Sequence, residues 1–267
     1  MSAAGGTRPS SLSAVHNDII SCDRCARLRS YCQEIGRIKK ASFRNDLYWA
    51  RPVPGFGDPN ARLLILGLAP AAHGANRTGR VFTGDGVGAS GDFLMAALKR
   101  AGFANISTSQ RTDDGLKLTG AYIAAAVRCA PPDNKPLPEE IDRCLAHLQN
   151  EIAHLPRLRV VVALGKIAWD AWLKLLILNG ESLPRPRPAF GHGASWTHGG
   201  ITLIGAYHPS RQNTNTGVLT SRMYDDVFRR VKRALAAERS KGSKSPRRSK
   251  GGVPSSIDPD PVRGTGG

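Results

Sequence analysis

Residues 67–86 read GLAPAAHGANRTGRVFTGDG. The apolar run Leu63 to Leu66 precedes this stretch, and a helical pattern from Asp92 to Arg100 follows it. An apolar run, then glycine-rich sequence, then a helix is typical of the carboxyl edge of a parallel strand, where α/β sheets bind ligands. The stretch is longer than most strand-to-helix connections, so it is either a flexible glycine loop or an active-site wall.

The composition of this loop favours an active-site wall over a flexible loop. Its glycines let backbone amides approach a ligand closely, and Pro70 stiffens the turn. Phe82 offers a flat ring near the carboxylate of Asp85.

Three further apolar runs resemble strands, at residues 120–127, 160–164 and 201–207. Helical patterns separate the four candidates, and this alternation predicts a three-layer α/β/α sandwich with a central, mostly parallel sheet. The loops after Leu66, Val127 and Ala206 then share one edge. Residues 27–40 are interpreted as a basic link, residues 51–60 as turns without regular structure, and residues 182–200 as a loop.

We expect one catalytic domain over residues 12–238, between a disordered N-terminus (residues 1–11) and a disordered basic tail (residues 239–267). The formal charge is +17, of which the tail carries +5. This excess over the whole chain predicts a partner rich in phosphates. A membrane surface would also attract it, but no stretch approaches the length of a spanning helix. The first twelve residues have no secretory core, which predicts a cytoplasmic protein, and we expect a monomer.

Five cysteines in a cytoplasmic chain favour metal or redox chemistry over disulfides. Cys22 and Cys25 form a short chelating pair, while Cys129 and Cys144 form a wider one. Four thiolates can hold either zinc or an iron–sulfur cluster, and their spacing does not decide between them. Cys129 and Cys144 could also be ordinary buried residues, and Cys32 is left over.

The glycine-rich loop, the distant HPSRQNTNTG at residues 208–217 and the spaced cysteines together resemble the uracil-DNA glycosylase superfamily. Within it, the sequence is most similar to family 5, the iron–sulfur enzymes. The resemblance covers roughly residues 15–235. It implies the glycosylase α/β/α fold, a [4Fe-4S] cluster on Cys22, Cys25, Cys129 and Cys144, and removal of uracil and other damaged bases from DNA.

The reaction has its own requirements. Breaking an N-glycosidic bond builds positive charge on the sugar and negative charge on the leaving base, so a carboxylate and a hydrogen-bond donor are needed. Asp85 and His208 have these chemical types. We expect Asp85 to orient the attacking water and steady the sugar, and His208 to donate to a base carbonyl. Phe82 is the candidate ring for a base that leaves the stack.

The resemblance points to the amide of Asn134 for base selection and to the backbone of Gly67 to Ala71 for the remaining wall. Many relatives carry an acidic or amide side chain where this chain reads Ala69-Pro70-Ala71. This departure implies a roomier pocket that accepts several deaminated bases and makes Asp85 the better candidate for activating water. The second loop, residues 210–217, is expected to press into the duplex, with contacts to DNA from Ser210, Arg211, Asn213 and Asn215.

Two other functions deserve comparison. A non-catalytic nucleic-acid-binding module, stabilised by its cysteines, would keep the charge but would not need Asp85 or His208. A phosphate-transfer enzyme with a P-loop is disfavoured, because the glycine-rich loop lacks the Gly-Lys-Ser/Thr ending that holds phosphates and magnesium.

Overall fold

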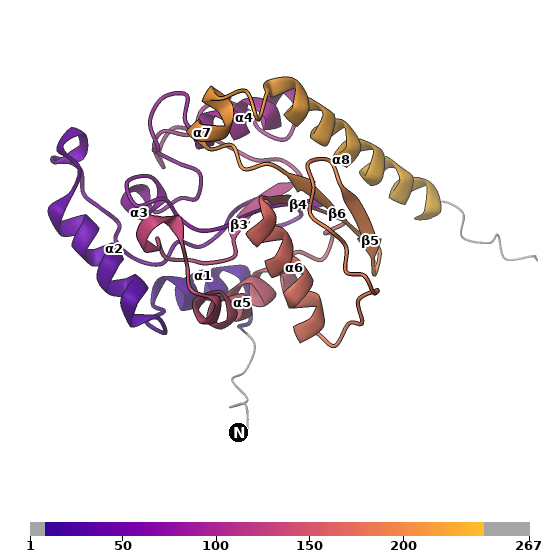
Figure 1. Cartoon of the computed structure of the whole chain (residues 1–267), viewed down its shortest axis with the longest axis horizontal. Helices are drawn as coiled ribbons and strands as arrows, with labels where there is room; N and C mark the ends of the chain where they lie inside the picture. Colours follow the sequence, from indigo (N-terminus) through magenta and orange to yellow (C-terminus); the bar gives the residue numbers. More distant parts are fainter. Residues whose placement is uncertain (1–8, 243–267) are drawn as a thin grey trace, which may run out of the picture.

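The computed structural model describes residues 9–242, with side chains up to residue 237. A six-stranded sheet with the order β1-β3-β2-β4-β6-β5 forms its centre (Figure 1). The four inner strands are parallel and the two outer ones are antiparallel to their neighbours. The strands are β1 (Phe56–Gly57), β2 (Leu63–Gly67), β3 (Ala121–Ala125), β4 (Val160–Leu164), β5 (Ser195–His198) and β6 (Ile201–Ala206).

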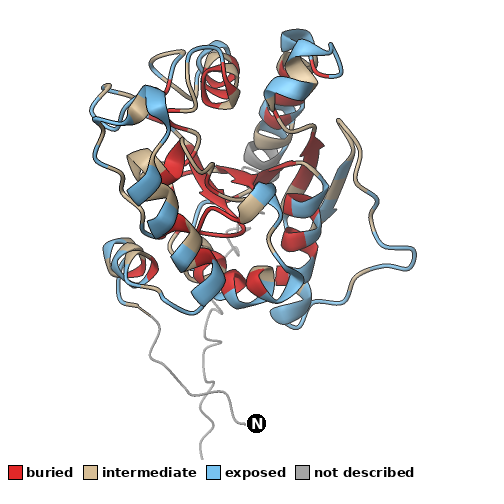
Figure 2. Cartoon of the chain, turned by 60° about the vertical axis from the view of Figure 1, so that its left-hand side comes forward, coloured by how far each residue is buried: buried red, intermediate tan, exposed pale blue. Residues whose placement is uncertain are grey.

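Helices cover both faces of this sheet, so the predicted three-layer α/β/α arrangement is confirmed. Figure 2 shows the buried strands between helical layers. One layer contains α4 (Ser90–Arg100) and α8 (Ser221–Gly242), and the other contains α1 (Leu12–Ile20), α5 (Pro138–Ala153) and α6 (Lys166–Leu178). The remaining helical elements are α2 (Ala26–Ile38), α3 (Ala75–Thr78), α7 (Arg211–Asn215) and the 3-10 turns η1 (Ala41–Phe43) and η2 (Pro132–Asn134).

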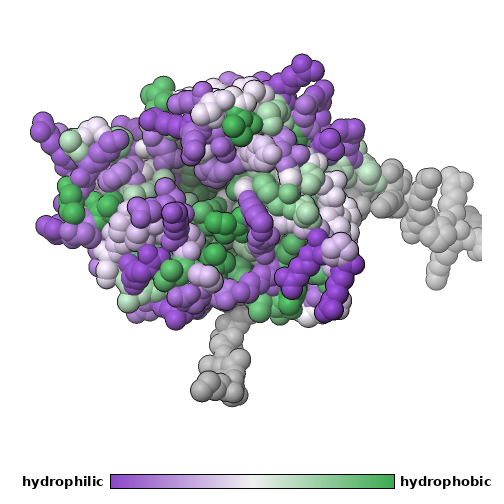
Figure 3. Space-filling model, viewed as in Figure 1, coloured by the Kyte–Doolittle hydropathy of each residue, from purple (hydrophilic) through white to green (hydrophobic). Residues whose placement is uncertain are grey.

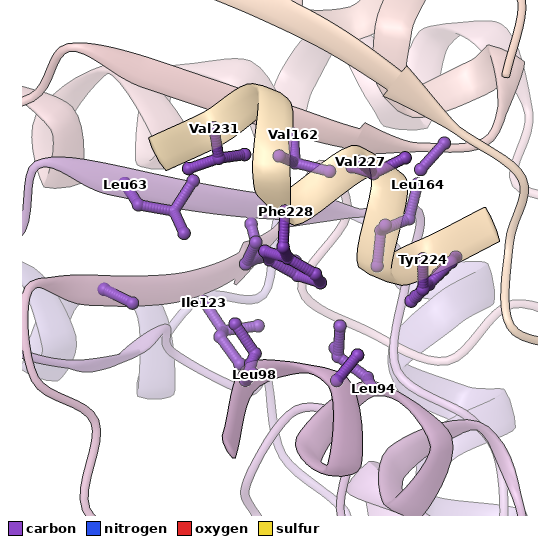
Figure 4. Close-up of a cluster of buried hydrophobic side chains, with 14 of the residues drawn as sticks. Leu63, Leu94, Leu98, Ile123, Val162, Leu164, Tyr224, Val227, Phe228 and Val231 are labelled. Atoms are coloured by element: carbon purple, nitrogen blue, oxygen red, sulfur yellow. The ribbon is translucent and has the colours of Figure 1, made fainter. Parts of the chain in front are cut away.

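Alternate residues of the inner strands supply the two cores. Along β2, Leu63 and Ile65 face α4 and α8, whereas Leu64 and Leu66 face α5 and α6. All five residues of β2 are buried, as expected of a parallel strand covered on both sides. In the first core, side chains from α4, α8 and the sheet meet around Phe228 (Figure 4). A buried side chain of this size contributes about 1.5–3 kcal/mol through removal of apolar surface from water.

Three secondary-structure predictions were wrong. Residues 51–60 contain β1, and residues 182–200 contain β5; edge strands tolerate nearby proline and glycine because one side needs no ladder partner. Residues 27–40 form most of α2 rather than a link. Leu28 and Cys32 bury one face of that helix, while Arg27, Glu34 and Arg37 are exposed.

The two special loops are also more regular than predicted. The stretch at residues 67–86 contains α3, and the stretch at residues 210–217 contains α7. At the C-terminus, α8 extends to Gly242, four residues beyond the predicted domain end. Residues 1–8 and 243–267, which hold most of the two tails predicted to be disordered, lie outside the described residues.

The carboxyl ends of β2, β3 and β6 lie at the same edge of the sheet, because all three are parallel. The loops that follow them meet there, as predicted. Figure 3 shows mainly hydrophilic side chains over this view of the molecule, with apolar ones at the centre and in smaller patches around it. Among residues 9–242, no helix is long and apolar enough to cross a membrane.

Candidate active site

A cavity of about 310 Å³ opens at this edge of the sheet. Its wall combines residues that follow β2 and β6 with Ala125 at the end of β3 and Asn134 in η2 after it, so three distant parts of the sequence share it. The lining residues are Leu68, Ala69, Ala71, Ala75, Val81, Phe82, Asp85, Ser90, Ala125, Asn134, His208, Ser210 and Arg211. The structure thus places Asp85 and His208 in one pocket, as the sequence predicted.

The Asp85 carboxylate packs tightly against the backbone. A Cβ at Gly74 would lie only 1.6 Å from Asp85 Oδ1, so this glycine makes room for the acid. Within residues 9–242, no group donates a hydrogen bond to the carboxylate. Burial raises the pKa of Asp85 to about 6, although the guanidinium groups of Arg211 and Arg77 oppose the rise. Asp85 is therefore an anion at neutral pH with its lone pairs free for water or a sugar.

Two arginines hold the loop that carries Asp85. Arg77 donates from Nη2 to the Gly84 carbonyl at 2.6 Å and from Nε to the His73 carbonyl at 2.9 Å. It also forms an ion pair with Asp46 at 2.5 Å. These bonds tie together the two ends of the loop around α3. These contacts favour an ordered active-site wall over a flexible glycine loop.

Arg80 fastens the same loop to the chain beyond α4. Its Nε donates to Thr83 Oγ1 at 2.8 Å, and its Nη2 forms an ion pair with Asp114 at 2.6 Å. Thr83 and Ser109 share a further hydrogen bond between their hydroxyls at 2.7 Å. Arg77 and Arg80 thus both hold the residues immediately before Asp85, through Gly84 and Thr83.

His208 lies just after β6 and lines the same pocket as this loop. Burial lowers the pKa of His208 to about 4, so the imidazole is neutral at physiological pH. Its backbone carbonyl accepts a hydrogen bond from Asn213 Nδ2 at 2.8 Å. In the described part of the chain, no group hydrogen-bonds either ring nitrogen, so the imidazole is free to donate to a ligand.

Phe82 stands beside His208, with the two ring centroids 5.9 Å apart and the planes tilted by 31°. Its backbone has a left-handed φ of 53°, which is costly for a bulky residue. Two glycines leave the space that Phe82 needs in this conformation. A Cβ at Gly67 would lie 2.9 Å from the Phe82 ring, and one at Gly91 would lie 2.2 Å from the Phe82 carbonyl.

The predicted base-binding residues divide into two groups. Ala69, Ala71, Phe82 and Asn134 line the pocket, and no side chain in residues 9–242 pairs with the Asn134 amide. Gly67 and Pro70 are buried and lie outside the lining set. Gly67 instead supports Phe82 from behind, because a glycine is the residue that leaves room for that ring.

The predicted DNA-contacting residues belong to α7 and its first turn. Ser210 and Arg211 reach the pocket rim, and Arg211 is exposed with its guanidinium beside Gly86. Ser210 also caps α7, since its Oγ accepts from the backbone N–H of Asn213 at 3.2 Å. The Asn213 amide donates to the His208 backbone carbonyl, so it ties α7 to the backbone that carries the imidazole. Asn215 is exposed at the end of α7.

With this geometry established, comparison with known proteins decides the family. The profile of the uracil DNA glycosylase superfamily matches residues 54–232. The chain belongs to the uracil DNA glycosylase superfamily. The matched segment contains the whole sheet and every lining residue of the pocket.

Relatives in this superfamily extend the match to most of the chain. A type-5 uracil-DNA glycosylase of Thermus thermophilus is 50% identical over 216 residues, which cover 80% of this chain and 94% of that protein. A type-5 uracil-DNA glycosylase of Mycobacterium tuberculosis is 48% identical over 225 residues, covering 83% and 81%. A type-4 uracil-DNA glycosylase of Pyrobaculum aerophilum is 31% identical over 173 residues, covering 64% and 69%.

The pocket of this superfamily member contains one acidic side chain among its lining residues, that of Asp85. The first loop contributes Ala69 and Ala71 where a polar side chain would narrow the space. Sequence reasoning did not single out Ala75 and Val81 within the first loop, Ser90, which begins α4, or Ala125, the last residue of β3. The position of Ala125 at a strand end on the same edge was the available signal for it.

Four of the five cysteines gather against the buried face of α2. Cys25, Cys129, Cys144 and the extra Cys32 pack in one cluster with Leu28, Val127 and Ala130. Cys22 lies in the turn between α1 and α2. All five thiols are free, and within residues 9–242 no three ligating side chains are already arranged around a metal position.

The donor chemistry of this region nevertheless fits a thiolate-bound metal centre. The neighbours Leu28, Val127 and Ala130 are apolar. The proposed ligands come from the turn before α2, from α5 and from the segment after β3, and the Arg128 backbone N–H donates to Cys144 Sγ at 3.3 Å. Cys32 Sγ instead donates to the Ala130 carbonyl at 3.6 Å. The Cys32 carbonyl accepts from Asn76 Nδ2 at 3.2 Å, which links α2 to α3.

Proposed function

We propose that this protein excises uracil from DNA by hydrolysing the N-glycosidic bond, and that the same pocket accepts other deaminated bases. The observation that carries this proposal is the pocket that Asp85 and His208 both line, because it combines an anion with a neutral donor. The superfamily membership and the type-5 relatives support it.

The charges of the two groups suit the bond that breaks. The C1′–N bond cleaves with its electron pair leaving on the base, and a water oxygen then bonds to C1′. Asp85, ionised above pH 6, stabilises the positive sugar and orients that water, which passes its proton to solvent or to the carboxylate. His208 donates a hydrogen bond to the base carbonyl on which negative charge collects, and a neutral imidazole suffices for this.

The pocket wall suits a flat, polar heterocycle. Phe82 supplies the aromatic face that offsets the cost of unstacking a base, about a few kcal/mol. Asn134 offers an amide that can both donate to and accept from the base edge. Ala69 and Ala71 leave space beside the base, which favours acceptance of several deaminated bases.

DNA is held by charge around the pocket mouth. Arg211 is exposed at the rim, where it can contact a phosphate flanking the extruded nucleotide. Helix α7 lies close enough to enter the gap that the base leaves, and Ser210 and Asn215 are the polar groups for contacts there. The net charge of +17 supplies attraction that depends on salt but not on sequence.

We further propose that Cys22, Cys25, Cys129 and Cys144 hold a [4Fe-4S] cluster, with zinc as the alternative. When bound, the cluster supplies a structural tie between the N-terminal helices, the segment after β3 and α5. No cysteine faces the pocket, so the glycosidic step uses none of them. A brown protein with broad visible absorbance and bound iron is expected, and a colourless zinc protein would contradict this assignment.

Oligonucleotides that each carry one altered base test the reaction, with alkali revealing abasic sites. Asp85→Asn and His208→Ala should greatly reduce base release and leave DNA binding intact. Asp113→Asn and His198→Ala serve as matched controls, because both residues lie outside the pocket. If the protein were instead a non-catalytic DNA-binding module, no abasic sites would appear and all four variants would behave like the parent.

A further inference from the structure

The chain leaves the sheet at the residue before His208, and side chains hold it there. β6 ends at Ala206, whose carbonyl accepts a hydrogen bond from the Gly165 N–H at 2.8 Å. Tyr207 lies one residue beyond the strand, and its peptide groups bond to side chains instead of to a neighbouring strand. The His208 ring has no hydrogen-bond partner within the described residues, so its position depends on this backbone and on packing against Phe82.

His192 holds the backbone N–H of Tyr207. Its Nδ1 accepts from that N–H at 3.1 Å, while its Nε2 donates to the Met223 carbonyl at 3.3 Å. These two bonds select the neutral tautomer with its proton on Nε2. Burial lowers the pKa of His192, although the bond to Met223 opposes this, so Nδ1 remains an acceptor at neutral pH. His192 therefore supplies the acceptor that a strand carbonyl would supply inside a sheet.

The segment before β5 brings His192 to this place. Its backbone pairs with β6 at Gly205, because the Gly193 N–H donates to the Gly205 carbonyl and the Gly205 N–H donates to the Ala194 carbonyl, each at 2.8 Å. Alternate residues of a strand direct their peptide groups to the same neighbour, so Tyr207 is the next residue to face this segment. Within residues 9–242, no backbone group bonds to Tyr207 there, and the imidazole of His192 takes that place.

Tyr224 of α8 holds the backbone carbonyl of Tyr207. Its hydroxyl donates to this carbonyl at 2.8 Å, and the residue is 1% exposed. The ring packs edge-on against Phe93 of α4, with the centroids 5.1 Å apart, and against Phe228 of α8. Burial raises the pKa of Tyr224, so the hydroxyl keeps the proton that it donates. The core between α4 and α8 thus fixes the position of this hydroxyl.

We propose that His192 and Tyr224 are positioning residues for the imidazole of His208. They act through the peptide groups of Tyr207, and the inference rests on the function proposed above. A donor stabilises a leaving base best when it lies about 2.7–3.1 Å from the oxygen on which charge collects. The Asn213 amide holds the carbonyl of His208 itself, so three side chains fix three successive peptide units around the imidazole.

Single-turnover uracil release tests the proposal in variants that each remove one bond to Tyr207. His192→Leu removes the acceptor, and Tyr224→Phe removes only the donating hydroxyl. Each should release uracil about tenfold more slowly than the parent, because a small displacement of a positioned group costs rate. Affinity for uracil-containing DNA, measured by fluorescence anisotropy, should stay at the parent's value. His192→Asn should recover most of the rate, since its amide oxygen can accept in place of Nδ1.

Two control variants match these substitutions. Tyr122→Phe also removes a buried hydroxyl, which donates to Glu151 at 3.1 Å, and Tyr122 lies outside the pocket. His198→Leu removes an imidazole of β5 that contacts Glu181. Both controls should release uracil at the parent's rate. Thermal unfolding reports the stability cost of every substitution separately.

The sharpest measurement repeats His192→Leu and Tyr224→Phe in a His208→Ala background. Residues that act only through the imidazole have nothing left to position there, so neither should slow the residual release further. A loss by the same factor in both backgrounds would overturn the proposal and leave the two residues purely structural. Where the residual rate is too slow to measure, the contrast between Tyr224→Phe and Tyr122→Phe decides.

The proposed function fails in a different way from this inference. An unsubstituted protein that releases no uracil, or a His208→Ala variant as fast as the parent, would refute the proposed reaction itself. An active protein that needs His208 but keeps its full rate in both His192→Leu and Tyr224→Phe would refute only the positioning role.

Discussion

Replacing Gly74 by alanine would place a methyl group against the Asp85 carboxylate. The added Cβ would lie 1.6 Å from Oδ1, whereas ordinary contact begins at about 3.4 Å, so the carboxylate must move by about 1.8 Å. The φ of Gly74 is −99°, outside the left-handed region, so steric overlap rather than that kind of backbone strain dominates.

A displacement of this size should slow base release strongly. A 1 Å misplacement of a positioned group can cost about 10²-fold in rate, or about 2.7 kcal/mol of transition-state stabilisation. We therefore expect Gly74→Ala to lose at least about 10²-fold in single-turnover uracil release from an oligonucleotide.

The matched control is Gly191→Ala, where the added Cβ would meet its nearest neighbour at an ordinary 3.5 Å. It should retain the parent's rate. Thermal unfolding and DNA binding should show that Gly74→Ala remains folded and binds DNA. A folded Gly74→Ala protein that releases uracil at the parent's rate would refute the assignment of Asp85 to the reacting centre.

Three further predictions concern the same pocket. Single-turnover base release should fall as the pH drops below about 6, because the active form of Asp85 is the anion and its pKa is raised to about 6; a rate unchanged between pH 7 and 4.5 would contradict this. The raised pKa also means that ionising Asp85 destabilises the fold as the pH rises from about 4 to 6. Asp85→Asn should then stabilise the protein at pH 8 by up to about 3 kcal/mol, with the gain vanishing near pH 4 in denaturant titrations. Phe82→Ala should weaken binding to uracil-containing DNA by about 1–3 kcal/mol through lost stacking and leave binding to undamaged DNA unchanged, as measured by fluorescence anisotropy.

Much of the architecture is readable from the sequence because the inner strands are uniformly apolar. The runs that became β2 and β4 are buried on both faces, and a parallel sheet is the common arrangement that allows this. Once those strands are parallel, their following loops must share an edge. The meeting of Asp85 and His208 followed from that rule.

Other features depend on contacts that a linear pattern does not contain. β1 has two residues and exists because it pairs with the edge of β3, so no local periodicity marks it. The support of Phe82 by Gly67 likewise depends on a contact between residues distant in the sequence. Sequence reasoning placed Gly67 on the pocket wall instead. Arg128 reads as an ordinary basic residue until the packing of α5 against β3 encloses it.

The hydrogen bond from the Asn76 amide to the Cys32 carbonyl connects the cysteine region to the loop that carries Asp85. α3, which contains Asn76, also contains Arg77, whose guanidinium fastens the segment just before Asp85. Any loosening of α2 would thus free the loop that carries the acid while the sheet stayed intact. Removal of the proposed metal centre should then stop base release at a temperature well below that at which the core melts.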